Sequence, residues 1–224
     1  MKEVVLLFDY DGTLVDIDKL KAYEAVVAKY SSTVDHTLAE ALHQLDNEFC
    51  MQGQYDRHKV FEKYVDKFGN TDIEQLCQAF WDELSRTQKI KPDCIETLNT
   101  LKDDGYIIVC VTDSDGPGGN KLRRIKKTGL DDYFKAIFIG GEGGNVPHRK
   151  GSTKYLKSVI EKLSMEGSRY VMIGDKTKID LEPAESMGMV TILMKNEEYP
   201  GTWQLEVKRL PELIMEIRGI RFYN

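Results

Sequence analysis

Five short apolar runs constrain the fold of this chain more than any other feature of its sequence. They are rich in β-branched residues and occupy residues 4–8, 106–111, 136–139, 170–173 and 189–194. From the second run onward, segments with apolar residues at helical spacing separate them. Fully apolar strands that alternate with helices are typical of a parallel sheet that is buried on both faces. The sequence therefore predicts an α/β fold with a Rossmann-like parallel sheet core and helices on both faces of the sheet.

Residues 16–89 interrupt this alternation, because they contain no convincing strand. Apolar residues recur there at helical spacing in four stretches, which are residues 22–30, 36–45, 55–69 and 71–84. The last stretch begins with Thr71 and Glu74, which fit a capping box. About four amphipathic helices can bury a small core of their own. We therefore expect an inserted α-helical cap domain at residues 16–89, and an α/β core domain at residues 1–15 and 90–224.

The net charge of the chain argues against a nucleic-acid partner. The 224 residues carry a formal charge of −6, with a pI of about 5.4, so a positive field for phosphate backbones is absent. The basic run at residues 123–127 is expected to be the solvated face of a short helix, whose apolar side carries Leu122 and Ile125. No apolar run is long enough for a signal peptide or a membrane span, so we expect a cytoplasmic protein with no membrane partner.

The cysteines and histidines show no metal-ligand spacing. Cys50, Cys77, Cys94 and Cys110 are scattered and form no C-x-x-C pair, so they are expected to be reduced residues of the core or of helices. The four histidines are equally scattered. Neither a disulfide framework nor a zinc site is therefore expected.

Carboxylates and hydroxyls follow the apolar runs, where parallel strands would end. They are Asp9, Asp11, Thr112, Asp113, Ser114, Asp175 and Asp180. Carboxylates that converge there repel one another strongly, and a divalent cation removes that penalty. Oxygen ligands without histidine or cysteine favour Mg²⁺. We predict a magnesium site built from Asp9, Asp175 and the backbone carbonyl of Asp11, to which Asp180 contributes either as a ligand or from just behind the ligands.

Two aspartates that flank a single tyrosine suit phosphoryl transfer. If Asp9 attacks a phosphorus, a separate acid must protonate the leaving oxygen and later take a proton from water. Asp11 lies two residues further on and is the candidate for that role. Asp9 would then be ionised, and Asp11 protonated, when the ester bond breaks. Thr112 and Lys150 are the candidates for holding the phosphate oxygens.

Four segments in this order resemble the motifs of the haloacid dehalogenase (HAD) superfamily, most of whose members are phosphatases. They are DYDGTL at 9–14, VTDS at 111–114, a lysine before a helix at 150, and IGDKTKID at 173–180. The resemblance implies an aspartyl-phosphate intermediate on Asp9 and acid/base catalysis by Asp11. It implies that Thr112 and Lys150 bind phosphate. It also implies Mg²⁺ held through Asp9, Asp11 and Asp175, and the helical insertion resembles the family's C1-type cap.

The third motif departs from the usual pattern of the family. Its lysine commonly stands in K-P-x-P, whereas this chain has PHRKGSTKY at residues 147–155. Lys150 is the preferred candidate, because it follows a long loop and precedes a helix. Lys154 and Arg149 compete with it.

The resemblance favours a Mg²⁺-dependent phosphatase of a small phosphorylated metabolite, acting as a monomer or a homodimer. A phosphomutase and a non-enzymatic regulatory or binding member are the alternatives. A haloacid dehalogenase is disfavoured, because that branch typically lacks the second aspartate, which is Asp11 here. The helical insertion disfavours a signalling receiver domain. In the cap, Arg57 is the best candidate for a substrate contact, and the alternative is a surface pair with Asp56 or Glu62.

Overall fold

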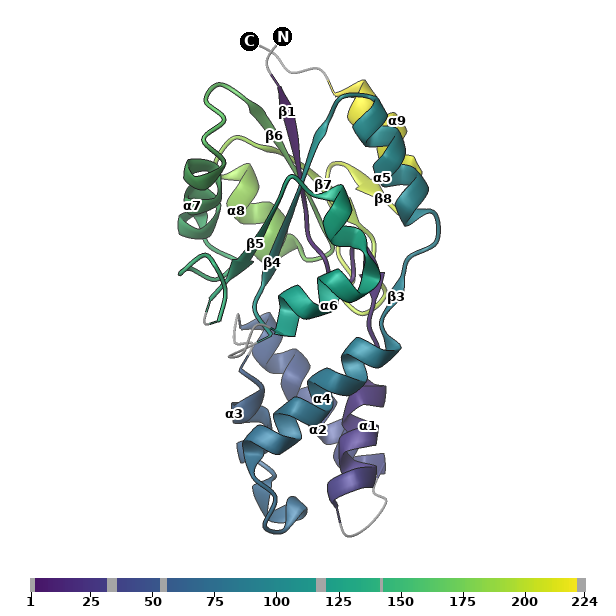
Figure 1. The fold of residues 1–224 in the computed structure, drawn as a ribbon, viewed down its shortest axis with the longest axis vertical. Coiled ribbons are helices and arrows are strands. Elements are labelled where there is room, and N and C mark those ends of the chain that lie inside the picture. Colours follow the sequence, from purple (N-terminus) through teal and green to yellow (C-terminus); the bar gives the residue numbers. More distant parts are fainter. Residues whose placement is uncertain (1–2, 32–35, 53–55, 116–119, 142, 221–224) are drawn as a thin grey trace.

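Six parallel strands form the main sheet of the computed structural model, which describes all residues except 1–2, 32–35, 53–55, 116–119, 142 and 221–224. The strands lie in the order β5-β4-β1-β6-β7-β8 (Figure 1). Their bounds are Val4–Phe8 (β1), Ile107–Asp113 (β4), Ala136–Gly140 (β5), Arg169–Gly174 (β6), Val190–Met194 (β7) and Glu206–Val207 (β8). The five longer strands match the five apolar runs to within two residues, so the predicted parallel α/β sheet is confirmed. The short strand β8 was not predicted.

Helices cover both faces of the sheet (Figure 1). On one face lie α5 (Cys94–Asp103), α6 (Asn120–Thr128) and α9 (Glu212–Gly219), and on the other lie α7 (Thr153–Leu163) and α8 (Glu182–Glu185). Side chains of β1 alternate between these layers: Leu6 and Phe8 belong to the first, and Val5 and Leu7 to the second. Because both faces of the strand are buried, its sequence is apolar at every position.

Between β1 and β4 the chain forms a helical insert with a core of its own. It contains α1 (Lys19–Tyr30), α2 (His36–Met51), α3 (Arg57–Glu62), the 3-10 helix η1 (Val65–Phe68) and α4 (Ile73–Thr87). Tyr23 lies in the middle of this core, with its ring centroid 4.5 Å from that of Phe80 and 5.7 Å from that of Phe61. The predicted helical insertion is confirmed. None of the described helices combines the length and the apolar character needed to cross a bilayer.

Two very short strands stand at the base of the insert. β2 (Val15–Asp16) and β3 (Lys89–Ile90) pair in an antiparallel manner, so the chain leaves the core and returns to it at neighbouring positions. They lie at the predicted limits of the cap domain, and those limits stay a prediction. Beyond this base, α4 of the insert contacts α6 of the core.

Two details of the predicted helices are wrong. The stretch at residues 55–69 does not form one helix, since α3 ends at Glu62 and is followed by η1. The capping residue of α4 is Asp72, one position later than expected, and its side chain accepts a hydrogen bond from the backbone N–H of Glu74. Aspartate caps helices at least as well as threonine, and it stands directly before the first helical residue, so the Thr71 capping box does not form.

All four cysteines are buried and their thiols are free, as predicted. Cys94 and Cys77 lie in helices, and burial raises the pKa of each thiol to about 12. A thiol with such a pKa stays protonated near neutral pH and is a poor nucleophile. Neither Cys77 nor Cys94 is therefore suited to act as a nucleophile.

A histidine in the insert makes the stability of the protein depend on pH. His58 Nε2 lies 2.6 Å from Glu74 Oε2, and His58 Nδ1 lies 3.2 Å from Asp56 Oδ1. Partial burial lowers the pKa of His58, but the bonds to Glu74 and Asp56 outweigh it and raise the pKa above its usual value. A pKa that is higher in the folded state gives stability below the unfolded pKa, and this stability is lost as the pH rises through the folded pKa.

We expect His58→Gln to lower the melting temperature at about pH 5 and to leave it unchanged at about pH 9, where the histidine is neutral in both states. Because the pair is largely exposed, the loss should stay below about 1 kcal/mol. Thermal unfolding at both pH values measures it, with the exposed His36→Gln as the matched control. An equal loss at both pH values would contradict this reading of His58.

Candidate active site

The central position of β1 brings three strand ends to one edge of the sheet. β1 pairs with β4 and with β6, and Phe8 lies opposite Cys110 and Ile173 in the two ladders. The backbone N–H of Asp9 continues the second ladder by donating to the carbonyl of Ile173, at 2.9 Å. Thr112, buried near the end of β4, lines the same pocket as Asp9. The sequence predicted this convergence.

Three buried carboxylates form the innermost group of this edge. One oxygen each from Asp9, Asp175 and Asp180 lies within 4.8 Å of the others, and none of the three residues is more than 4% exposed. The hydroxyl of Thr13 donates to Asp9 Oδ2 at 3.5 Å. A group of oxygen ligands without nitrogen or sulfur suits a hard divalent cation. The three carboxylates can therefore hold a metal ion, and they include three of the four predicted metal-ligating residues.

Two glycines allow the carboxylates to approach the backbone so closely. Gly12 has a φ of +84°, which L-residues rarely adopt, and a Cβ at this position would overlap Asp175 Oδ2. A Cβ at Gly174 would overlap the side chain of Asp180. The short π-helix η3 (Thr177–Leu181) then turns Asp180 back toward the group, and its Oδ2 accepts the backbone N–H of Lys176 at 3.0 Å. Glycine is therefore required at both positions for steric reasons.

Two lysines compensate part of this negative charge. Lys150 Nζ pairs with Asp9 Oδ1 and lies 2.6 Å from Asp180 Oδ1, and Lys176 Nζ lies 3.1 Å from Asp175 Oδ1. Burial raises the pKa of Asp175 to about 7, the neighbouring carboxylates add to this rise, and Lys176 opposes it. Burial likewise raises the pKa of Asp180, against the effect of Lys150. Burial and the neighbouring carboxylates thus outweigh the two lysines, and a bound metal ion would favour the ionised forms of both carboxyls.

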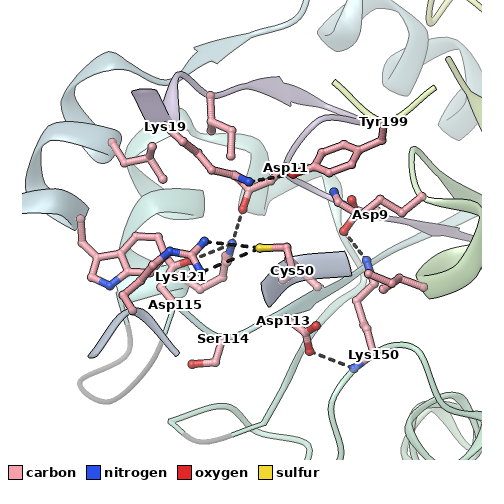
Figure 2. A pocket seen from close by; sticks show the side chains of 17 residues that line it. Asp9, Asp11, Lys19, Cys50, Asp113, Ser114, Asp115, Lys121, Lys150 and Tyr199 are labelled. Atoms are coloured by element: carbon pink, nitrogen blue, oxygen red, sulfur yellow. Dashed lines mark hydrogen bonds and ion pairs between the residues drawn. The ribbon is translucent and has the colours of Figure 1, made fainter. Parts of the chain in front are cut away.

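The structure distinguishes the three candidates for the third-motif cation. Lys150 is buried at its side chain and points to Asp9, as Figure 2 shows. Its backbone N–H donates to Asp113 Oδ1 at 2.9 Å, which fixes the loop before α7. Lys154 is exposed on α7, and Arg149 lies beside Gly141. Only Lys150 of these three lines the pocket that contains Asp9, and its role in binding phosphate stays a proposal.

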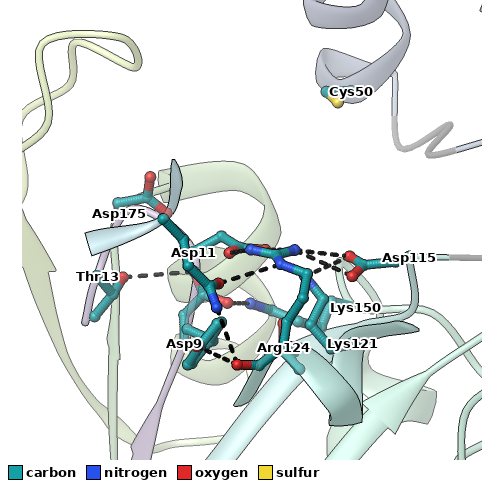
Figure 3. Close-up of polar contacts among 12 residues, drawn as sticks. Asp9, Asp11, Thr13, Cys50, Asp115, Lys121, Arg124, Lys150 and Asp175 are labelled. Atoms are coloured by element: carbon teal, nitrogen blue, oxygen red, sulfur yellow. Dashed lines mark hydrogen bonds and ion pairs between the residues drawn. The ribbon is translucent and has the colours of Figure 1, made fainter. Parts of the chain in front are cut away.

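A second group of charges lies beside the first. Asp11 and Asp115 face Lys121 and Arg124, both of which project from α6 (Figure 3). Lys121 Nζ is 2.8 Å from Asp115 Oδ1, and Arg124 Nη1 is 3.1 Å from each oxygen of Asp115. Both cations also pair with Asp11. Two carboxylates are thus matched by two cations in a buried cluster.

The cluster corrects the prediction for residues 123–127. Arg123, Lys126 and Lys127 are exposed on a short helix, as predicted. Arg124, however, is 1% exposed and does not lie on a solvated face, whereas Leu122, expected on the apolar side, is 38% exposed. Ile125 is buried as predicted. Lys121 and Asp115 were not predicted as site residues from the sequence. A signal was present, since Lys121 and Arg124 are three residues apart and therefore share one face of a helix that follows Asp115. Basic side chains are normally expected to be exposed. They can be buried here only because acids at the strand ends pair with them.

The surroundings of Asp11 favour its ionised form, whereas the protonation expected from the sequence concerns the moment at which the ester bond breaks and stays a prediction. Burial alone would raise the pKa of its carboxyl, but Arg124 and Lys121 outweigh burial and hold the pKa well below its usual range. Asp11 is therefore an ionised carboxylate in this arrangement. The sequence contains no direct sign of this, because the two cations come from a helix more than a hundred residues away.

The insert closes the other side of the pocket. The cavity of about 80 Å³ is bounded by Asp9, Asp11 and Lys150 from the core, and by Cys50, Arg57 and Trp81 from the insert. Arg57 is buried, pairs with Asp46 at 2.6 Å, and lies 5.3 Å from the ring centre of Trp81. It therefore faces the cavity, and the expected alternative of a surface pair with Asp56 or Glu62 does not describe it.

Comparisons with known proteins agree with this geometry. A family model described as haloacid dehalogenase-like hydrolase matches residues 4–188. The chain is 25% identical to a glyceraldehyde 3-phosphate phosphatase of Pyrococcus furiosus, over 94% of this chain and 88% of that protein. It is 28% identical to a phosphoglycolate phosphatase of Agrobacterium fabrum, over 75% of this chain and 71% of that protein.

Solved structures share the fold over nearly the whole chain. A crystal structure of the HAD-hydrolase YfnB from Bacillus subtilis, bound to magnesium, superposes with a TM-score of 0.76 at 19% identity, covering 98% of this chain and all of that one. An HAD phosphatase from Thermococcus onnurineus superposes with a TM-score of 0.68 at 28% identity, covering 99% of this chain and all of that one. The match includes the helical insert as well as the sheet.

The carboxylate group predicts metal binding that can be measured without turnover. We expect Asp175→Asn to weaken Mg²⁺ binding by at least about tenfold, because it removes a charged oxygen ligand. Isothermal titration calorimetry with MgCl₂ measures this loss. The control is Asp132→Asn, an exposed position in the 3-10 helix η2 (Leu130–Tyr133). An unchanged Mg²⁺ affinity in the folded Asp175→Asn variant would contradict the assignment.

Proposed function

The chain belongs to the haloacid dehalogenase-like hydrolase family, and we propose that it is a Mg²⁺-dependent phosphatase that hydrolyses a small phosphomonoester metabolite through an aspartyl-phosphate on Asp9. One observation carries the proposal. The buried carboxylates of Asp9, Asp175 and Asp180 converge at the strand ends, with Lys150 bridging two of them. The relatives named above are phosphatases, which supports this reaction class.

In the first step, an oxygen of Asp9 forms a bond to phosphorus while the bond from phosphorus to the ester oxygen breaks. The departing oxygen takes a proton from the carboxyl of Asp11, which has to gain that proton before this step, because Lys121 and Arg124 favour its ionised form. In the second step, the oxygen of a water molecule forms a bond to phosphorus while the bond from phosphorus to the Asp9 oxygen breaks, and Asp11, now a carboxylate, accepts a proton from that water. Phosphate leaves and Asp9 is free again. The ionised Asp11 seen beside Lys121 and Arg124 is the form that the second step uses.

The remaining polar residues of the site would hold the phosphoryl group. Lys150 brings a buried positive charge next to Asp9, and Thr112 offers a hydroxyl from the end of β4. Both would bind the oxygens that carry charge in the transition state. We assign Mg²⁺ to Asp9, Asp175 and the backbone carbonyl of Asp11, supported by Asp180. When bound, the ion offsets the negative charge of the phosphoryl group and of the attacking carboxylate.

We assign the role of a cap to residues 16–89 and the role of the catalytic core to residues 1–15 and 90–224. A cavity of about 80 Å³ between them suits a small substrate. Arg57 faces that cavity from the insert and is the proposed contact for the part of the substrate beyond the phosphoryl group. The two relatives are named for small phosphorylated metabolites, glyceraldehyde 3-phosphate and phosphoglycolate.

A panel of phosphomonoesters tests the reaction class. It should contain glyceraldehyde 3-phosphate, 2-phosphoglycolate, glycerol 3-phosphate and 4-nitrophenyl phosphate, each assayed with and without Mg²⁺. We expect Mg²⁺-dependent release of inorganic phosphate from at least one alkyl ester. Conversion of a sugar phosphate into its isomer without free phosphate would instead indicate a phosphomutase.

The proposed nucleophile predicts the behaviour of one variant. Asp9→Asn should lower the rate of phosphate release by at least about a thousandfold, because an amide cannot form the acyl phosphate. The assay uses the best substrate of the panel, with Asp132→Asn as the control of matched chemistry. Persistent hydrolysis by purified, folded Asp9→Asn would refute the mechanism.

A further inference from the structure

Arg124 is a buried cation that the proposed mechanism does not use. It is 1% exposed and does not line the cavity, whereas its partners Asp11 and Asp115 do. A charge so completely removed from water costs several kcal/mol unless it is well paired. The pairing found here therefore has to be close to complete, and it fixes the side chains that take part in it.

The guanidinium of Arg124 bridges two carboxylates at once (Figure 3). Nη2 binds Asp11 Oδ1, and Nη1 lies 3.3 Å from Asp11 Oδ2, so both oxygens of Asp11 are held. The same Nη1 lies 3.1 Å from both oxygens of Asp115. Asp11 can rotate only if this fork is broken. A lysine at this position would keep the charge but could not reproduce the two-sided planar contact.

Arg124 also touches residues outside the charged cluster. Its guanidinium lies 5.9 Å from the ring centre of Tyr10, and the Tyr10 hydroxyl donates to its backbone carbonyl at 3.4 Å. Its Nε lies 3.3 Å from Gln88 Oε1, just beyond the end of α4, and its guanidinium lies 6.0 Å from the ring centre of Trp81. The same side chain thus rests on the loop that carries Asp11 and on the helix that closes the cavity.

We propose that Arg124 is the positioning residue for Asp11: its fork, braced by Asp115, Gln88 and Trp81, holds the Asp11 carboxyl at the edge of the cavity where the ester oxygen departs. The inference rests on the proposed function. It assigns Arg124 no contact with substrate. Lys121, which lines the cavity, gives Asp11 charge but no planar constraint.

The dependence of rate on the leaving group tests this role. An alkyl alcohol leaves slowly unless an acid protonates it, whereas 4-nitrophenolate leaves without such help. General acid catalysis typically contributes about 10²–10⁴ in rate. We expect Arg124→Lys to lower kcat/KM for the best alkyl ester of the panel by at least about tenfold more than kcat/KM for 4-nitrophenyl phosphate. Partial unfolding would lower both values equally.

Two further variants make the test specific. Arg123→Lys, at the exposed neighbouring position of α6, should leave the ratio of the two kcat/KM values unchanged. In an Asp11→Asn background, Arg124→Lys should have no further selective effect on the alkyl ester, because it acts through Asp11.

Each failure has a distinct meaning. If the wild-type protein releases phosphate from no alkyl ester, the proposed function is wrong. If it does so, and Arg124→Lys lowers both kcat/KM values equally or neither, the role of Arg124 in positioning Asp11 is overturned. A selective loss that persists in the Asp11→Asn background would overturn it as well.

Discussion

The compensation of buried carboxylates is the constraint on which this structure depends. Asp9, Asp175 and Asp180 meet at the end of the sheet, and Asp11 lies beside them. Charges of one sign at such distances repel strongly away from water. Cations from three places compensate this negative charge: the loop before α7, the residue after Asp175, and α6. Cations that come from separate parts of the chain therefore hold this edge of the sheet together.

The cations compensate Asp11 and Asp175 to different degrees, and this difference agrees with the different roles of acid/base catalysis and metal binding. Asp11 is matched by Lys121 and Arg124, and the pKa of its carboxyl is lowered. Around Asp175, burial and neighbouring carboxylates prevail over Lys176, and the pKa of its carboxyl is raised to about 7. Cations of the protein alone compensate the charge of Asp11. Asp175 belongs to a group that gains from a further cation, which agrees with its assignment to metal binding.

Sequence patterns predicted the sheet and the convergence of the acids, because both follow from local rules. An apolar run such as residues 4–8 signals a buried strand, and parallel strands end at one edge, which places Asp9 near Asp175. The patterns failed where a long-range partner reverses a local preference. Arg124 has the appearance of a surface residue in its own helix, and its pairing with Asp115 and with Asp11, 113 residues earlier, explains its burial. Arg57 is buried for a similar reason, since it pairs with Asp46 of another helix.

Identification of the residue that carries the phosphoryl group is the most direct test of this account. The fastest ester of the panel, labelled with ³²P, would be mixed with the protein and Mg²⁺ and quenched in acid within a single turnover. The labelled peptide would then be mapped by mass spectrometry. We expect a hydroxylamine-sensitive phosphoryl group on Asp9. A label on any other residue, or phosphate release that precedes all labelling of the protein, would contradict it.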